Sequence, residues 1–134
     1  MSATRKPLYA VKPGWNDFMA FPDVIKAGFG SAINILQRGG MPQSGYKRLS
    51  GTGRPPLEQL NDDGEGNLTY RVLLVTMDTG VYVLHAFTKK SRKGIATPKP
   101  DMDLAKQRRQ HAVACDANLR AGSGITPPVV PIGR

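Results

Sequence analysis

The pattern of apolar and polar positions is clearest in the middle of the chain, where two apolar runs follow each other. Residues 70–77 and 81–87 are rich in β-branched and aromatic side chains, which favour strands. The short connection at residues 78–80 suits a hairpin. Both runs are apolar on both faces, as in central strands that helices cover. The pattern therefore predicts an antiparallel pair of strands at the centre of the fold.

A helix is predicted on either side of this pair of strands. Residues 23–38 are predicted to form an amphipathic helix that ends at Gly39 and Gly40. A second helix is predicted to begin at Asp101, a suitable N-cap after two prolines, and to extend to about Arg120.

Shorter elements complete the predicted order. Residues 8–11 and 57–60 can form short strands, and Asn16 or Asp17 can cap a helical turn. Residues 41–56, rich in glycine and proline, are expected to be a loop. This order predicts an α+β fold, in which N-terminal helices and a C-terminal helix pack on a small antiparallel sheet.

The chain length of 134 residues allows one hydrophobic core. Residues 1–120 are predicted to form a single domain, with a turn at residues 61–66. Residues 121–134 contain three prolines and three glycines and no periodic apolar face, so this tail is expected to be disordered.

Positive charge dominates the composition, with 19 Lys and Arg against 10 Asp and Glu and a formal net charge of +9. Between residues 67 and 100 the only acid is Asp78. The cations of the same stretch are Arg71, Lys89, Lys90, Arg92, Lys93 and Lys99. Such a local excess points to a polyanionic partner, a nucleic acid above all.

Several classes of function lack their sequence signatures. One cysteine, Cys115, excludes an internal disulfide and a cysteine-based zinc site, and no HExxH motif, Walker loop or GxSxG motif occurs. No metal or other cofactor is predicted. No apolar run approaches the roughly 18 residues of a membrane helix, and no signal peptide opens the chain. We therefore expect a cytoplasmic protein with no membrane partner.

The end of the second predicted strand carries the candidate chemistry. Alternation places Val81, Val83, His85 and Phe87 on one face, opposite Tyr82, Leu84 and Ala86. The strand is expected to end at Thr88. A cationic loop then follows, formed by Lys89, Lys90, Arg92 and Lys93.

Arg71, near the start of the first predicted strand, is expected to lie across the hairpin near residues 87–89. An arginine inside an apolar strand is costly unless it is paired or hydrated. Either it meets an acid, Glu58 or Asp62, or it lines a site for an anion.

Arginine and lysine side chains of this kind can promote RNA cleavage without a metal. The 2′-hydroxyl of RNA is a built-in nucleophile beside each phosphodiester, and cations stabilise the charge that develops on the phosphorane. His85 has a suitable pKa for proton transfer if solvent reaches it, although a buried histidine bonded to the backbone is the alternative. A lysine would need a pKa lowered by its cationic neighbours.

The same residues carry a resemblance to a known family. The segments are Tyr70-Arg71-Val72, residues 81–87, Lys89-Lys90-Ser91, residues 94–98 and residues 101–109, with weaker support from Phe21-Pro22 and residues 37–39. Over residues 6–112 the chain resembles the phage-type HigB-like branch of the RelE/ParE toxin superfamily.

The resemblance implies the toxin of a type II toxin–antitoxin system, an endoribonuclease that cuts mRNA on the ribosome through the RNA 2′-hydroxyl. Arg71 would stabilise the phosphate, and Lys89 and Lys90 would hold it, with one of them or His85 in proton transfer. Further RNA contacts are implied for the basic residues Lys47, Arg48, Arg54, Arg92 and Lys93. The implied partner is a small helix-turn-helix antitoxin that covers or distorts the basic site.

One departure and two alternatives accompany this interpretation. Ile95, Ala96 and Thr97 stand where RelE carries a tyrosine that assists the chemistry, so the general base is unassigned. The chain could instead be a ParE-type inhibitor that binds DNA gyrase, against which the Lys89–Lys90 pair argues. It could also be a nucleic-acid-binding relative without catalysis.

Overall fold

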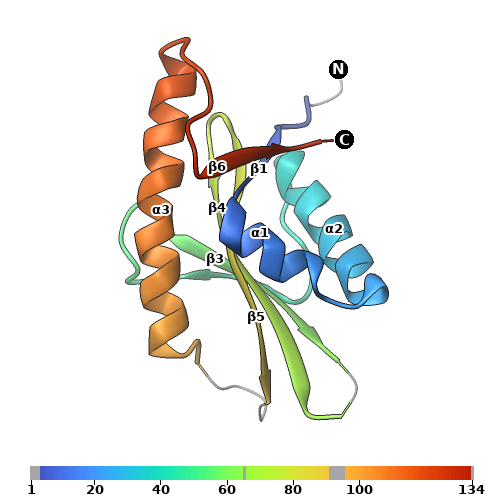
Figure 1. The fold of residues 1–134 in the computed structure, drawn as a ribbon. Helices are drawn as coiled ribbons and strands as arrows, with labels where there is room; N and C mark the ends of the chain where they lie inside the picture. Colours follow the sequence, from blue (N-terminus) through green and yellow to red (C-terminus); the bar gives the residue numbers. More distant parts are fainter. Residues whose placement is uncertain (1–3, 65, 91–95, 134) are drawn as a thin grey trace.

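A computed structural model describes residues 4–64, 66–90 and 96–133 of the chain (Figure 1). The elements in chain order are β1 (Leu8–Val11), α1 (Lys12–Met19), α2 (Asp23–Gln37), β2 (Tyr46–Leu49), β3 (Leu57–Asp63), β4 (Leu68–Met77), β5 (Gly80–Lys90), α3 (Lys99–Arg120) and β6 (Val129–Ile132).

The predicted α+β class is confirmed. The strands form one sheet in the order β2-β3-β4-β5-β1-β6, with β4 and β5 at its centre. Only the β1–β5 pair is parallel among these strands. Helix α3 covers one face of the sheet, and α1 and α2 cover the other (Figure 1).

The alternation of β4 divides the core into two layers. Val72 and Leu74 pack toward α1 and α2, whereas Leu73 and Val75 pack toward α3. All four side chains are fully buried. At about 25 cal/mol per Å² of apolar surface, each contributes roughly 1.5–3 kcal/mol to folding, so the hairpin predicted from the sequence is the main source of core burial.

A β-bulge changes the side-chain pattern of β5. Leu73 pairs with His85 but its neighbour Leu74 pairs with Val83, so Leu84 is the extra residue. Beyond the bulge, the alternation of side chains between the two faces of the sheet is reversed, so His85 lies on the α3 face. The predicted grouping of His85 and Phe87 with Val83 is therefore wrong.

Helix α1 lies directly on this bulged segment. A side chain at Gly14 would place its Cβ 2.2 Å from the backbone oxygen of Leu84, which is closer than atoms can approach. Only glycine permits this contact between α1 and β5. The bulge that turns His85 toward α3 is thus packed against α1 on the opposite face of the sheet.

Several element boundaries differ from the predictions. Helix α1 begins at Lys12, ahead of the expected caps Asn16 and Asp17, and α3 begins at Lys99 rather than at Asp101. Strand β3 continues through the expected turn to Asp63, and β5 continues through Lys90. The two lysines that were expected in a loop therefore lie on a strand.

Two edge strands were not predicted at all. Strand β2 lies in the expected loop and pairs with β3, and β6 lies in the tail that was expected to be disordered. Both sequences are too short and irregular to signal strands by themselves. Each gains its hydrogen bonds from a neighbour, and Pro131 is tolerated because β6 is an outer strand.

Among the described residues, no helix is long and apolar enough to cross a membrane.

Candidate functional site

Arg71 is held inside the sheet by β4. It pairs directly with Phe87 of β5, which confirms the predicted position across the hairpin. Its side chain is only 5% exposed. Burial lowers the pKa of the guanidinium, while the nearby charges of Asp63 and Asp101 raise it. Arg71 thus carries a desolvated positive charge at the open end of the central strand pair.

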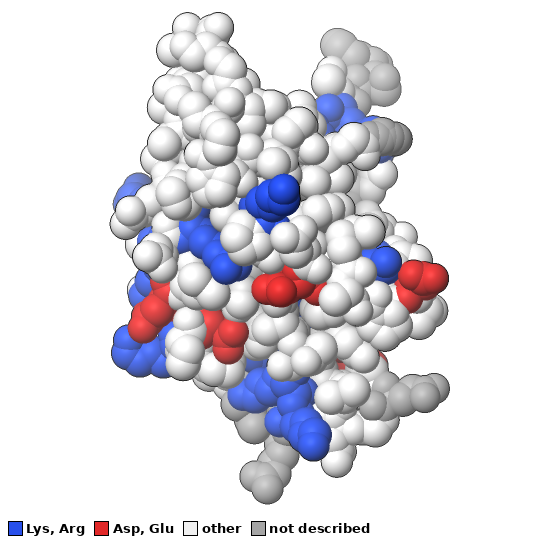
Figure 2. Space-filling view, in the orientation of Figure 1, with Lys and Arg blue, Asp and Glu red and all other residues white. Residues whose placement is uncertain are grey.

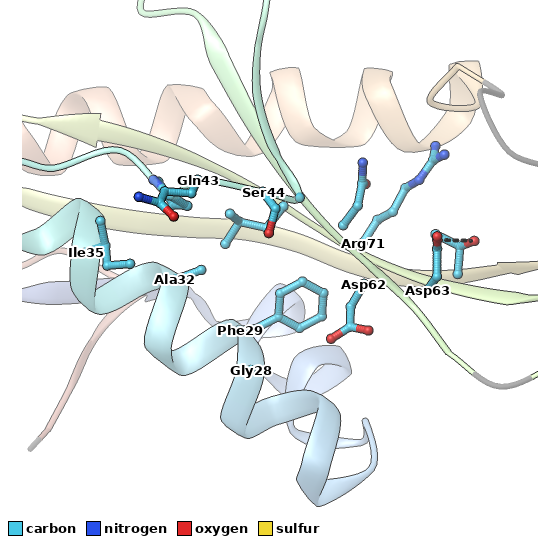
Figure 3. Close-up of a pocket in the computed structure, with 14 residues that line it drawn as sticks. Gly28, Phe29, Ala32, Ile35, Gln43, Ser44, Asp62, Asp63 and Arg71 are labelled. Atoms are coloured by element: carbon cyan, nitrogen blue, oxygen red, sulfur yellow. Dashed lines mark hydrogen bonds between the residues drawn. The ribbon is translucent and has the colours of Figure 1, made fainter.

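Neither of the two acids expected beside Arg71 shares its face of the sheet. Glu58 pairs with Leu74 on the α1/α2 side, where its carboxylate accepts from the Tyr46 hydroxyl at 2.8 Å. Asp62 points toward α2, away from the Arg71 side chain (Figure 3). The acids that act on Arg71 are instead Asp63 and Asp101.

His85 forms the second part of the site. Its Nε2 lies 2.7 Å from Oδ1 of Asp101, and its Nδ1 lies 3.3 Å from NH1 of Arg108. Since arginine can only donate, Nδ1 accepts, so the ring proton is on Nε2 and is donated to Asp101. The imidazole is 7% exposed and both of its nitrogens are engaged. This arrangement fixes the orientation of Asp101 at the edge of the site.

Arg108 was not singled out in the sequence. It also donates to the backbone oxygen of the bulge residue Leu84 at 3.1 Å, and burial lowers its pKa, which the charge of Asp17 raises. Asp101 and Arg108 are seven residues apart, so they share one face of α3 after two turns. That spacing is the signal that could have indicated their common role.

Lys89 and Lys90 extend the site beyond His85. Lys89 pairs with Thr69 and, by alternation, lies on the α3 face with His85 and Phe87, whereas Lys90 is exposed on the other face. The Nζ atom of Lys89 lies 3.5 Å from the backbone oxygen of Ala96. Figure 2 shows lysine and arginine side chains gathered at the end of the molecule where β5 ends in Figure 1.

We call six residues of this end, all from β4, β5 and α3, the Arg71 cluster. They are Arg71, His85, Phe87, Lys89, Asp101 and Arg108. The ring of Phe87 is partly buried and stacks on His85, with the two ring centroids 5.1 Å apart. The cluster combines three cations, of which Arg71 is the most buried, with an aromatic face and a hydrogen-bonded carboxylate.

The other predicted RNA contacts are distributed over two faces. Lys47 pairs with Gln59 and Arg48 with Glu58, so the two exposed side chains point to opposite sides of β2. Arg54 lies in a loop beside α3, where it lines a groove with Lys106 and Arg109. The structure therefore does not bring Lys47, Arg48 and Arg54 together on one surface.

Two further predicted contacts, Arg92 and Lys93, lie outside the described residues. The chain resumes at Ala96, and the hydroxyl of Thr97 donates to the side-chain oxygen of Gln59 on β3. This bond connects the segment before α3 to the same sheet face as the Arg71 cluster.

A separate cavity of about 660 Å³ lies between α2 and the outer end of β3 (Figure 3). We call it the α2 groove. One wall is apolar and comes from α2, with Phe29, Ala32 and Ile35. The other wall is polar and comes from β3 and β4, with Asn61, Asp62, Asp63, Thr69 and Arg71.

Within the described ranges, no three His, Cys, Asp or Glu side chains are grouped so that they could hold a metal ion.

Comparison with known proteins gives one family match. A family model described as phage-derived protein Gp49-like (DUF891) matches residues 16–110. This range includes α2, the strands β2 to β5 and all six residues of the Arg71 cluster. No curated protein sequence gives a significant match to the chain.

Proposed function

Because the chain belongs to the Gp49-like family of phage-derived proteins, which is part of the RelE/HigB-like toxin family, we propose that it is the toxin of a toxin–antitoxin pair. Its proposed activity is the cleavage of mRNA on the ribosome, with the RNA 2′-hydroxyl as nucleophile. The proposed partners are the ribosome-bound message and a small helix-turn-helix antitoxin.

The observation that supports this activity best is the placement of Arg71. A buried guanidinium binds an anion more strongly than an exposed one, because water competes less for it. Lys89 lies on the same sheet face and Phe87 pairs directly with Arg71. A phosphodiester can thus be held between two cations, with an aromatic ring available for an adjacent base.

The proposed reaction needs no external nucleophile. The 2′-oxygen attacks the adjacent phosphorus as its proton leaves, and the bond from phosphorus to the 5′-oxygen of the next nucleotide breaks. The products are a 2′,3′-cyclic phosphate and a 5′-hydroxyl, which takes up one proton. Arg71 stabilises the extra charge on the phosphorane, and Lys89, on the same sheet face, holds the scissile phosphate. Lys90, on the other face, is left to a flanking phosphate.

The hydrogen bonds of His85 narrow the choice of groups that could transfer protons. Only Nδ1 of His85 could accept a proton, and it already accepts a hydrogen bond from Arg108, which suits His85 to a positioning role. The Asp101 side chain is 25% exposed and so is open to a ligand. We assign the general base to Asp101 and keep Lys89 as the candidate acid.

The test is induced expression followed by primer extension on cellular mRNA. The proposal expects growth arrest and cuts in translated messages, lost in Arg71→Ala and weakened in Lys90→Ala. Arg38→Ala is the matched control, because Arg38 is an exposed residue just after α2 whose Nε donates to Asn34 of that helix. Growth arrest with intact mRNA and altered DNA supercoiling would contradict the proposal and favour gyrase inhibition.

A further inference from the structure

Helix α3 carries a second group of positive charges, outside the Arg71 cluster. A groove of about 610 Å³ lies between this helix and the loop that connects β2 to β3. We call it the α3 groove. Its lining includes three cations, followed here by their polar and apolar neighbours: Arg54, Lys106 and Arg109, with Gln107, Gln110 and Val113. None of the described residues that line the groove is acidic.

The spacing of the lining residues places them on one side of α3. From Lys106, further lining residues follow after three, four and seven positions, which is the spacing of one helix face. Ala105 and Ala112, on the other side of the helix, are fully buried against the sheet. Arg108 also turns toward the sheet, where it donates to a backbone oxygen of β5. The neighbouring arginines of α3 therefore belong to different sites, Arg108 to the Arg71 cluster and Arg109 to the α3 groove.

Contacts between Arg109 and the loop hold the groove in shape. NH1 of Arg109 donates to the backbone oxygen of Pro55 at 2.8 Å. A Cβ at Gly53 would lie 2.8 Å from the guanidinium, so this group packs closely on the loop backbone. Arg54 stands between these two points of contact, which fix its backbone beside α3. The three cations are thus gathered before any ligand binds.

Cations gathered in one groove favour an anionic ligand. They repel one another, and a polyanion relieves this repulsion. The acid of α3 nearest in sequence to Lys106 is Asp103, whose carboxylate already lies 2.7 Å from Nζ of Lys99. The groove therefore has room for several negative charges from outside the chain.

The side chains of the lining also indicate which kind of nucleic acid fits. Proteins that hold unpaired strands combine cations with aromatic side chains on which the bases stack. None of the described lining residues of the α3 groove is aromatic, whereas Phe87 offers a ring in the Arg71 cluster. Paired RNA keeps its bases stacked inside the helix and presents phosphates and 2′-hydroxyls, which cations and amides can bind.

We propose that the α3 groove binds the backbone of paired RNA, with Arg54, Lys106 and Arg109 on its phosphates. Gln107 and Gln110 supply hydrogen bonds to phosphate oxygens or 2′-hydroxyls. The choice of RNA over DNA rests on the proposed function, because ribosomal RNA is largely paired. The groove then anchors the protein on paired RNA while the Arg71 cluster acts on the single-stranded message.

The experiment measures binding of a fluorescein-labelled RNA duplex by fluorescence anisotropy over a range of salt concentrations. Arg54→Ala, Lys106→Ala and the double variant remove cations, and Gln110→Glu adds a negative charge with little change in shape. Lys12→Ala is the matched control, because Lys12 is an exposed lysine of α1, which covers the other face of the sheet. The competitors are the unpaired strand, a DNA duplex of the same sequence and polyglutamate. Thermal melting reports the folding of each variant.

We expect the loss of each cation to lower the slope of log Kd against log salt concentration by about 1, and the double variant to lower it by about 2. The double variant should also bind the duplex at least tenfold more weakly at physiological salt. Gln110→Glu should bind more weakly than the wild type, and Lys12→Ala should bind at least as tightly as either single groove variant.

An unchanged salt slope in the folded double variant would overturn the inference. Equal competition by the unpaired strand or by polyglutamate would overturn it too, as would tighter binding of the DNA duplex. The proposed function is tested separately, because Arg71→Ala should bind the duplex like the wild type although it no longer cleaves mRNA. A wild type that binds the duplex through the groove but leaves mRNA intact would count against the proposed function alone.

Discussion

The two ends of the α3–sheet interface use the same kinds of residue for different purposes. At one end Asp116 of α3 accepts from the backbone nitrogen of Thr79 at 3.0 Å and from Nε of Arg120 at 3.0 Å. At the other end Asp101 of α3 accepts from His85 at 2.7 Å. The Asp116 side chain is 7% exposed and that of Asp101 is 25% exposed.

The difference lies in what surrounds each carboxylate. Asp116 closes the β4–β5 hairpin, and the hydroxyl of Thr79 also bonds both Asp116 and Tyr82, so the polar groups there bond to one another. Near Asp101, by contrast, Arg71 and Lys89 lie on one face of the sheet. Lys89 is only partly buried, so a ligand can reach this face there. We infer that the hairpin end stabilises the fold and that the open end positions groups for an anion.

The largest expected effect is that of Arg71→Ala on cleavage. Removal of the buried cation should lower the rate about 10²–10³-fold, as for the loss of one preorganised donor in a transition state. Urea denaturation should show that the variant is still folded under the conditions of the assay. A variant that cleaves like the wild type would place the phosphate elsewhere.

Asp116→Ala should have the opposite profile. The change leaves the Thr79 N–H without its acceptor and should cost about 2–3 kcal/mol in the free energy of unfolding. Urea denaturation measures this loss. Asp103→Ala is a control, because Asp103 is an exposed acid of the same helix that forms an ion pair with the exposed Lys99. Cleavage well below the melting temperature should be unchanged. A tenfold loss of cleavage in folded Asp116→Ala would break the division between the ends.

Arg108→Leu should give a smaller loss of activity. Without its bond to Nδ1, His85 is free to change tautomer or to protonate, and Asp101 loses its fixed partner. We expect cleavage to fall about tenfold, with the loss in kcat rather than in KM, and the pH–rate profile to shift. Arg108→Lys should restore part of the rate. A loss confined to thermal stability, with an unshifted pH–rate profile, would leave Arg108 a purely structural residue.

The smallest effect concerns the acid sensitivity of the fold. Burial raises the pKa of Asp116, but the bonds from Thr79 and Arg120 outweigh it, and the net pKa is below the ordinary value. Its stabilising contribution is present above the pKa of the unfolded chain, about 3.9, and is lost as the pH falls through the lower folded value. The urea midpoint of the wild type should therefore drop below about pH 4, and that of Asp116→Asn should change less. Parallel curves for the two proteins would show that Asp116 does not contribute to this dependence.

The features that the sequence could predict are those with local signals. The β4–β5 hairpin and α2 follow from apolar spacing, and α3 follows from a capping residue after two prolines. Antiparallel pairing then places Arg71 near Phe87. The face of His85 could not be predicted, because one extra residue at Leu84 reverses the alternation and the bulge depends on the contact with Gly14 of α1. Strands β2 and β6 exist through their neighbours, and the α2 groove depends on how β3 extends past β2.

The most direct test of the central claim is the analysis of RNA ends made by the purified protein on ribosome-bound mRNA, with and without a metal chelator. Attack by the 2′-hydroxyl within the Arg71 cluster predicts 2′,3′-cyclic phosphate and 5′-hydroxyl ends, formed equally in the chelator and lost in folded Arg71→Ala. Ends with a 5′-phosphate, cleavage that the chelator abolishes, or full activity of Arg71→Ala would contradict it.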